Sequence, residues 1–151
     1  MKMRLIAGGI AVLGTAAALT AFAQAKPEVL VKQRQAAMTL QGKYFGPLGA
    51  MARGKAPYNA AIAARNAGYL EVLSRLPWDG FDASTASVKS AALPAVYSNH
   101  AKFSQAAVDM QNAVDRLVAA TRGGDEAAVK AAIGAVGKTC GACHEHFRQK
   151  Q

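Results

Sequence analysis

Apolar residues recur at intervals of three and four along most of the chain, which is the spacing of one face of an α-helix. The first such segment opens at Pro27 and Glu28, with proline in its first turn and an acid near the positive end of the helix dipole. Its inward stripe comprises Val31, Arg34, Met38, Gln41, Phe45, Leu48 and Met51. Pro47 should kink this helix without ending it, because the pattern continues to Arg53-Gly54-Lys55.

Three further helices follow. The second is predicted over residues 57–76, and the third opens at Pro94 and ends at Gly123-Gly124. Residues 78–92 between them are rich in Ser, Asp and Gly and are predicted to be irregular. Asp125 is the expected N-cap of the fourth helix. Its apolar stripe comprises Val129, Ile133, Val136, Cys140, Cys143 and Phe147.

Four amphipathic helices, three connections and no strand pattern predict an all-α, up-down-up-down four-helix bundle. In that arrangement the end of helix four lies beside the starts of helices one and three and the end of helix two. Arg34, Met38, Trp78 and His100 are therefore expected at about the same depth as His144.

The amino terminus has the pattern of a secretory signal peptide. Lys2 and Arg4 precede an uncharged run over residues 5–20, and Ala21-Phe22-Ala23 supplies a small-x-small cleavage site. We predict a cleaved signal peptide over residues 1–23 and one mature domain over 24–151; cleavage after Ala25 is also open. A retained membrane anchor is the alternative.

The chain is basic, with 18 Lys and Arg against 9 Asp and Glu and a formal net charge of +9 at pH 7. These charges are scattered, and no run of them suggests nucleic acid. We interpret them as a solvated surface that can attract acidic partners.

Cys140-Gly141-Ala142-Cys143-His144 is the attachment signature of a c-type haem. Two thiols three residues apart on a helix point the same way and can each add to one vinyl group of a porphyrin. The imidazole of His144 then lies under the iron as its axial ligand. The chain has only two cysteines, and both lie in this motif. We therefore predict one haem c, covalently bound through Cys140 and Cys143.

Other interpretations of this motif stay open. A disulfide needs β-carbons about 3.5–4.5 Å apart, whereas residues three apart on a helix are separated by about 5–6 Å, so a bridge would be strained. A thioredoxin-like redox pair requires a strand before it and a helix after it, whereas this motif lies on a predicted helix a few residues from residue 151. A zinc site could use Cys140, Cys143 and His146, but a second pair of ligands is missing.

Four short motifs, in order, resemble those of the cytochrome c-prime family of exported bacterial haem proteins, which are four-helix bundles. They are Lys26-Pro27-Glu28 with Arg34-Gln35, Gly54-Lys55-Ala56-Pro57-Tyr58, Leu76-Pro77-Trp78, and the run C-G-A-C-H-E-H-F-R from Cys140 to Arg148. The resemblance covers essentially all of residues 24–151.

This resemblance implies a periplasmic protein in which His144 is the single protein ligand of a five-coordinate, high-spin iron. Arg34 and Gln35 would lie near the haem propionates, Met38 over the distal face, and Arg148 beside the proximal histidine. Members bind nitric oxide and carbon monoxide, generally not oxygen, and many form homodimers through helices one and two. For Trp78 the alternatives are a packing role and a place lining the haem.

We consider two other functions as alternatives to gas binding. One is a low-spin electron carrier with Met38 as sixth ligand, whose redox partner the sequence does not identify. The other is a haem enzyme, which is disfavoured because only His100 could supply a distal acid–base group. We expect a non-enzymatic haem protein, with no membrane attachment once the signal peptide is removed.

Overall fold

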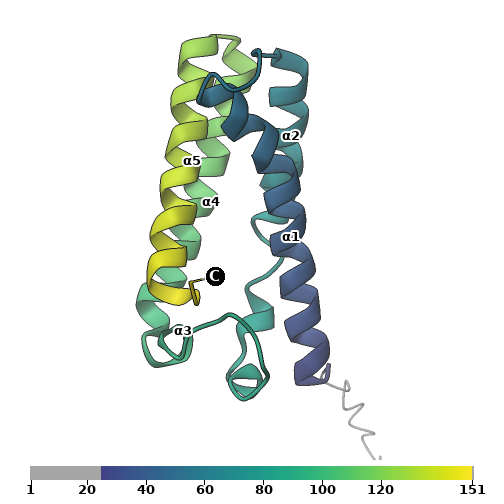
Figure 1. Ribbon diagram of the computed structural model, residues 1–151, viewed down its shortest axis with the longest axis vertical. Coiled ribbons are helices and arrows are strands. Elements are labelled where there is room, and N and C mark those ends of the chain that lie inside the picture. Colours follow the sequence, from purple (N-terminus) through teal and green to yellow (C-terminus); the bar gives the residue numbers. More distant parts are fainter. Residues whose placement is uncertain (1–24, 151) are drawn as a thin grey trace, which may run out of the picture.

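The structure is a computed structural model that describes residues 25–150. The predicted signal peptide lies outside the described residues. Four long helices run alternately in opposite directions (Figure 1), which confirms the up-down-up-down bundle. They are α1 (Pro27–Ala52), α2 (Ala60–Leu73), α4 (His100–Gly123) and α5 (Glu126–Phe147), and a single-turn α3 (Ala95–Ser98) precedes α4. Over residues 25–150 there is no strand, and one isolated β-bridge joins Ala92 to Arg148.

The helix ends largely follow local chemistry. Pro27 occupies the first turn of α1, and the helix continues through Pro47 as predicted. Gly124 ends α4 with a φ of 77°, in the left-handed region that favours glycine. The Asp125 carboxylate then accepts a hydrogen bond from the Ala127 amide at 2.9 Å, which confirms the predicted N-cap of α5.

The prediction for the second helix was too long. Its start lies at Ala60 rather than at residue 57, because Asn59 is the N-cap and its side chain accepts a hydrogen bond from the Ile62 amide at 2.9 Å. At the other end the helix stops at Leu73, and the chain passes through a turn in which the Leu76 amide donates to the Leu73 carbonyl.

The third helix was predicted as one continuous element, and this was wrong. The structure breaks it at Asn99, whose φ of −125° and ψ of 51° lie outside the helical region, so α3 and α4 are separate. Asparagine favours such breaks because its side chain competes with helical hydrogen bonding. The predicted irregular stretch contains two short 3₁₀ helices, η1 (Asp79–Phe81) and η2 (Ala83–Thr85).

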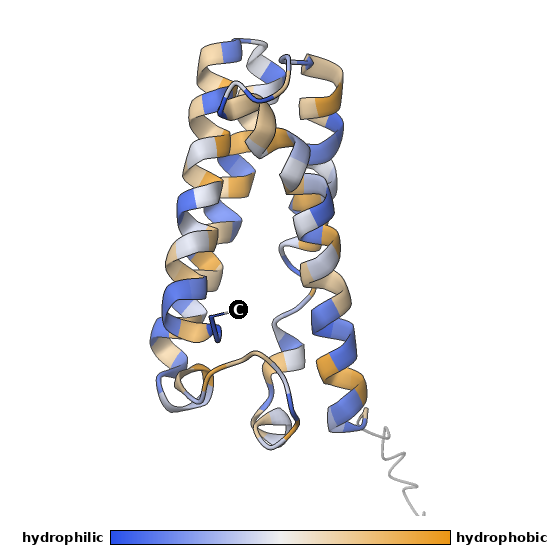
Figure 2. Cartoon of the chain, in the orientation of Figure 1, coloured by the Kyte–Doolittle hydropathy of each residue, from blue (hydrophilic) through white to orange (hydrophobic). Residues whose placement is uncertain are grey.

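Two groups of buried side chains form the core. The larger group packs between α1, α2, α4 and α5 and comprises Leu48, Ala63, Ala67, Leu70, Met110, Ala113, Val114, Leu117, Val118, Val129, Ile133 and Val136. The smaller group comprises Val96, Phe103 and Phe147. Trp78 packs against both groups. Hydrophobic and hydrophilic segments are interspersed along each long helix (Figure 2), as expected for amphipathic helices.

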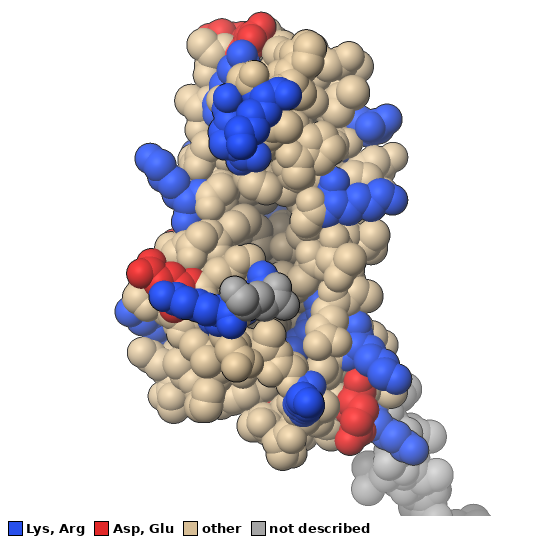
Figure 3. All heavy atoms as spheres, in the orientation of Figure 1, with Lys and Arg blue, Asp and Glu red and all other residues tan. Residues whose placement is uncertain are grey.

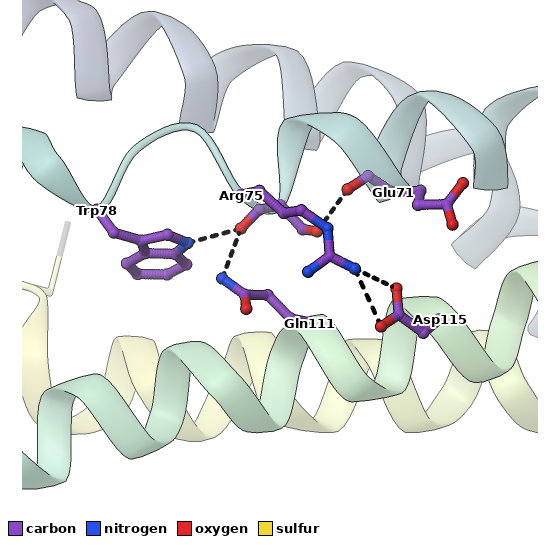
Figure 4. A network of polar contacts seen from close by, with 6 residues as sticks. Glu71, Arg75, Trp78, Gln111 and Asp115 are labelled. Carbon is purple, nitrogen blue, oxygen red and sulfur yellow. Dashed lines mark hydrogen bonds and ion pairs between the residues drawn. The ribbon is translucent and has the colours of Figure 1, made fainter.

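The end of α2 is fixed to α4 by hydrogen bonds. The Ser74 carbonyl accepts hydrogen bonds from Trp78 Nε1 at 2.6 Å and from Gln111 Nε2 at 3.3 Å (Figure 4). Beside it, Arg75 forms an exposed ion pair with Asp115 at 2.9 Å. These contacts set where α2 ends and where the loop toward η1 begins.

Candidate haem-binding site

One cavity of about 640 Å³ lies between the two core groups. The face of the molecule seen in Figure 3 is hollowed at mid-height, with Lys and Arg scattered around the hollow. The walls come from α1, α2, α4, α5 and the segment between α2 and α3. The lining residues are Arg34, Gln35, Met38, Thr39, Gln41, Gly42, Phe45, Leu70, Phe81, Ser90, Ala91, Ala92, Phe103, Met110, Val114, Val136, Cys140, Cys143, His144, Phe147 and Arg148.

The two thiols belong to the wall formed by α5. Cys140 and Cys143 are both free, half-buried and one helical turn apart. Burial raises the pKa of the Cys140 thiol, and burial followed by the charge of Cys140 raises the pKa of Cys143. At neutral pH both groups are therefore neutral thiols that face an apolar space.

His144 follows directly and lines the same cavity. Partial burial, followed by repulsion from the Arg148 guanidinium, lowers the pKa of its imidazole. The neutral imidazole is the form that binds metals, so this environment favours ligation. His146 is exposed and absent from the cavity lining, as expected for a position about 200° farther around the helix.

The wall formed by α1 combines apolar and polar side chains. Met38, Gly42 and Phe45 follow one another along it. A Cβ added at Gly42 would meet nothing within 4 Å, so the helix backbone itself is open to the cavity between the two larger side chains. Gln35 and Gln41 also line the cavity.

Arg34 is buried, with 3% of its surface exposed. Its guanidinium lies 4.2 Å from the centre of the Phe81 ring and donates to the Gly80 carbonyl at 2.6 Å. Its other acceptors are hydroxyl groups of Thr85, Ser90 and Tyr97, at 3.0, 3.0 and 3.3 Å. Over residues 25–150 no carboxylate forms an ion pair with it. The cavity is thus bordered by a buried cation whose protein partners are all neutral.

The loop before α3 is attached to the end of α5. The Leu93 amide donates to the Phe147 carbonyl at 3.0 Å, and the Gln149 amide donates to the Ala91 carbonyl at 2.8 Å. The ring of Phe147 packs edge-on against Phe103, with ring centres 5.3 Å apart. The segment after the haem motif therefore fixes one side of the cavity.

Seven of the eight residues singled out from the sequence line this cavity. The exception is Trp78, whose ring packs behind Phe81 and Phe103, at 6.2 and 5.8 Å between ring centres. His100, the one residue considered as a distal acid–base group, is exposed and near Ser104 and does not line the cavity.

Sequence reasoning missed the contribution of the irregular stretch. Phe81 and Ser90 line the cavity. Residues 78–92 have no hydrophobic periodicity, so the sequence does not indicate which of their side chains point inward. The available signal was composition: Phe81 is one of two large apolar residues in that stretch.

The arrangement fits a covalently bound haem. Two free thiols and an imidazole are adjacent on one wall of a largely apolar cavity. The buried guanidinium of Arg34, whose protein partners are all neutral, can bind an anionic group. A cavity of this size is within the range of cofactor sites. Fold and site together define a c-type cytochrome built on a four-helix bundle.

Comparisons with known proteins identify the family. The family model described as Cytochrome C' matches residues 29–148. A cytochrome c' of Rubrivivax gelatinosus is 43% identical over 126 residues, which are 83% of this chain and 98% of that protein. The chain belongs to the cytochrome c' family.

Solved structures agree with this assignment. A nitric oxide complex of a mutant cytochrome c prime from Alcaligenes xylosoxidans has a TM-score of 0.78 at 40% identity, covering 85% of this chain and 99% of that one. A carbon monoxide-bound variant of the same protein has a TM-score of 0.76 at 40% identity, covering 83% and 98%. Among the helices of residues 25–150, none has the length and apolar character needed to cross a membrane.

Proposed function

We propose that the protein is a periplasmic haem c protein that binds small uncharged gases and does not act as an enzyme. Cys140 and Cys143 would hold the haem through thioether bonds, and His144 would be the single protein ligand of its iron. When bound, haem c would supply an iron that can bind nitric oxide or carbon monoxide. The observation that carries the proposal is the presence of both thiols and His144 on one wall of an apolar cavity.

The buried charge of Arg34 supports a place for the haem propionates. Burying a cation is costly unless an anion or several hydrogen bonds compensate it. Its described partners are one carbonyl and three hydroxyls, so a propionate would add the missing opposite charge. Gln35, the next residue, lines the cavity and can donate a hydrogen bond to the same group.

Met38 covers the distal side as a flexible apolar lid. Phe45 lines the same wall and would hold α1 away from the haem, so that the thioether of Met38 would pack over the iron without ligating it. Arg148 lies beside His144 and favours its neutral form. In the alternative, Met38 is the sixth ligand and the protein is a low-spin electron carrier.

The names of the similar structures support gas binding. Variants of one relative at 40% identity have been solved with nitric oxide and with carbon monoxide. Since the cavity of this chain is largely apolar, it admits small uncharged ligands more readily than anions. An electron-transfer role, with a redox partner of unknown identity, is compatible with the same haem.

Export and dimerisation complete the proposal. The pattern of residues 1–23 supports secretion, and covalent haem attachment takes place in the oxidising compartment outside the cytoplasm. Exposed apolar side chains of α1 and α2 and of the turn after α2 support a homodimer through these two helices. They are Val29, Leu40, Tyr69, Val72 and Leu76.

The test compares two neighbouring histidines in the holoprotein. His144→Ala should change the haem absorption spectrum in both redox states, whereas His146→Ala, the matched control on the same turn, should leave it nearly unchanged. Haem should also stay with the wild-type chain through acid–acetone extraction. Haem that is extracted freely, or a large spectral effect of His146→Ala alone, would overturn the assignment.

A further inference from the structure

Gln41 is a polar residue of the α1 wall, and its side-chain amide is hydrogen-bonded to α2. It lines the cavity beside Met38, Gly42 and Phe45. Gln41 follows Met38 by three residues, so on an α-helix the two side chains point in directions about 60° apart. Gln41 therefore lies beside Met38, on the side of α1 that is turned toward α2.

The orientation of this amide is fixed by its partner. Gln41 Nε2 donates to the carbonyl oxygen of Leu73, the last residue of α2, at 2.8 Å. Because a carbonyl can only accept, the nitrogen and not the oxygen of the amide must be on that side. The Leu73 carbonyl is one of the groups that a helix leaves without an intrahelical partner, and the Leu76 amide reaches it only at 3.3 Å.

One N–H of Gln41 remains after this bond is made. An amide nitrogen carries two N–H groups, and the Leu73 carbonyl uses one. The side chain is half-buried and its rotamer is held by a bond to another helix, so the second N–H is oriented at little further entropic cost. Most residues that line the cavity as a whole are apolar, and a dipole in such a setting acts on a ligand with little screening.

We propose that Gln41 is a specificity-determining residue that donates a hydrogen bond to a small diatomic ligand on the distal side of the haem. This rests on the proposed function, since it requires an open distal position. Hydrogen-bond donors on the distal side influence which gaseous ligands a haem protein binds and whether it activates them. Met38 would then set the steric barrier and Gln41 the polarity of the same pocket.

The simplest rival is that Gln41 only caps α2. The chain offers a matched control for it, because Gln111 Nε2 donates to the Ser74 carbonyl, the next carbonyl along the same helix end (Figure 4). Gln111 is not part of the cavity lining. Gln41→Met and Gln111→Met therefore each remove an amide that bonds to the end of α2, while only the first changes the cavity.

The experiment measures the C–O stretching frequency of the reduced holoprotein saturated with carbon monoxide, together with the melting temperature. Both variants should melt at a lower temperature than wild type. Gln41→Met should shift the stretch to higher frequency, because a donor that favours electron density on the ligand oxygen has been lost. Gln111→Met should leave the frequency unchanged. An unshifted frequency in a folded Gln41→Met holoprotein would overturn the proposal.

A wild-type measurement covers the case in which Gln41→Met does not accumulate. Electron–nuclear double resonance of the nitric oxide complex in H₂O and D₂O should reveal an exchangeable proton coupled to the ligand, and its absence would overturn the proposal. Failure of the proposed function is distinguishable. In that case the wild-type iron is six-coordinate with Met38 as a ligand before any gas is added.

Discussion

At the scale of single residues, Arg34 is the most consequential side chain outside the haem motif. It is buried, it stacks on Phe81, and it bonds to four groups that lie 46 to 63 residues away along the chain. Gly80 permits this contact, because a Cβ there would meet both the Arg34 Cβ and the Leu30 carbonyl at 2.9 Å. One arginine thus connects α1 to the irregular segment.

We expect Arg34→Met to lower the free energy of unfolding of the holoprotein by about 3 kcal/mol, since several buried acceptors and a propionate would lose their donor. Denaturant unfolding measures this effect. Arg75→Met is the control, because the Arg75–Asp115 pair is 52% and 43% exposed and should contribute about 1 kcal/mol or less. Equal effects of the two substitutions would contradict the role given to Arg34.

Sequence reasoning reached Arg34 but not its partners. Arg34 lies on an otherwise largely apolar stripe, and a charge in such a place requires a partner. Gly80, Thr85 and Ser90 could not be named, because irregular segments have no periodicity that relates sequence position to direction. Tyr97 lies in α3, and its bond to Arg34 depends on where that short helix lies relative to α1. Gln41 is a similar case, since its bond to Leu73 depends on how two helices pack.

At the scale of helices, the contact between α1 and α5 above the haem motif depends on a glycine. A Cβ added at Gly137 would lie 3.3 Å from Cζ of Phe45, which is tighter than ordinary van der Waals contact. The small residue therefore lets α5 approach the ring of Phe45 one turn before Cys140.

We expect Gly137→Leu to destabilise the holoprotein by about 1–3 kcal/mol, because the added side chain overpacks this contact and pushes Phe45 toward the cavity. Gly134→Leu, one turn earlier on α5, should be neutral or stabilising. A Cβ at Gly134 meets nothing within 4 Å, and leucine is a better helix former than glycine. Thermal unfolding of both variants measures the difference, and a loss that is as large for Gly134→Leu would contradict this packing.

The helices themselves were predictable, and their ends less so. Asp125 was identified because a capping residue acts through its own neighbours. α2 starts at Ala60 and not at Pro57, because the side chain of Asn59 caps the helix. The break at Asn99 interrupts an otherwise continuous stripe, and periodicity alone does not detect it.

At the scale of the whole molecule, the exposed apolar residues favour one side of the bundle. Val72 is 61% exposed and Leu76 54%, at the end of α2 and in the turn that follows it. In a two-fold dimer the same patch is used by both copies. A charge placed there would face its own copy across the axis.

We therefore expect Val72→Glu to shift the protein from dimer to monomer in sedimentation velocity, with the haem spectrum unchanged. Val108→Glu is the control, because Val108 is also exposed, at 45%, but lies on α4. A dimer that survives Val72→Glu, or one that Val108→Glu disrupts, would contradict an interface through α1 and α2.

The most direct test of the central claim is the visible and electron paramagnetic resonance spectrum of the oxidised and reduced holoprotein, compared between wild type and Met38→Ala. We predict high-spin, five-coordinate haem in both proteins. Met38→Ala should bind carbon monoxide more tightly, because an apolar lid has been removed from the distal side. A low-spin wild-type spectrum with a sulfur-to-iron band that disappears in Met38→Ala would contradict the gas-binding assignment and make Met38 the sixth ligand of an electron carrier.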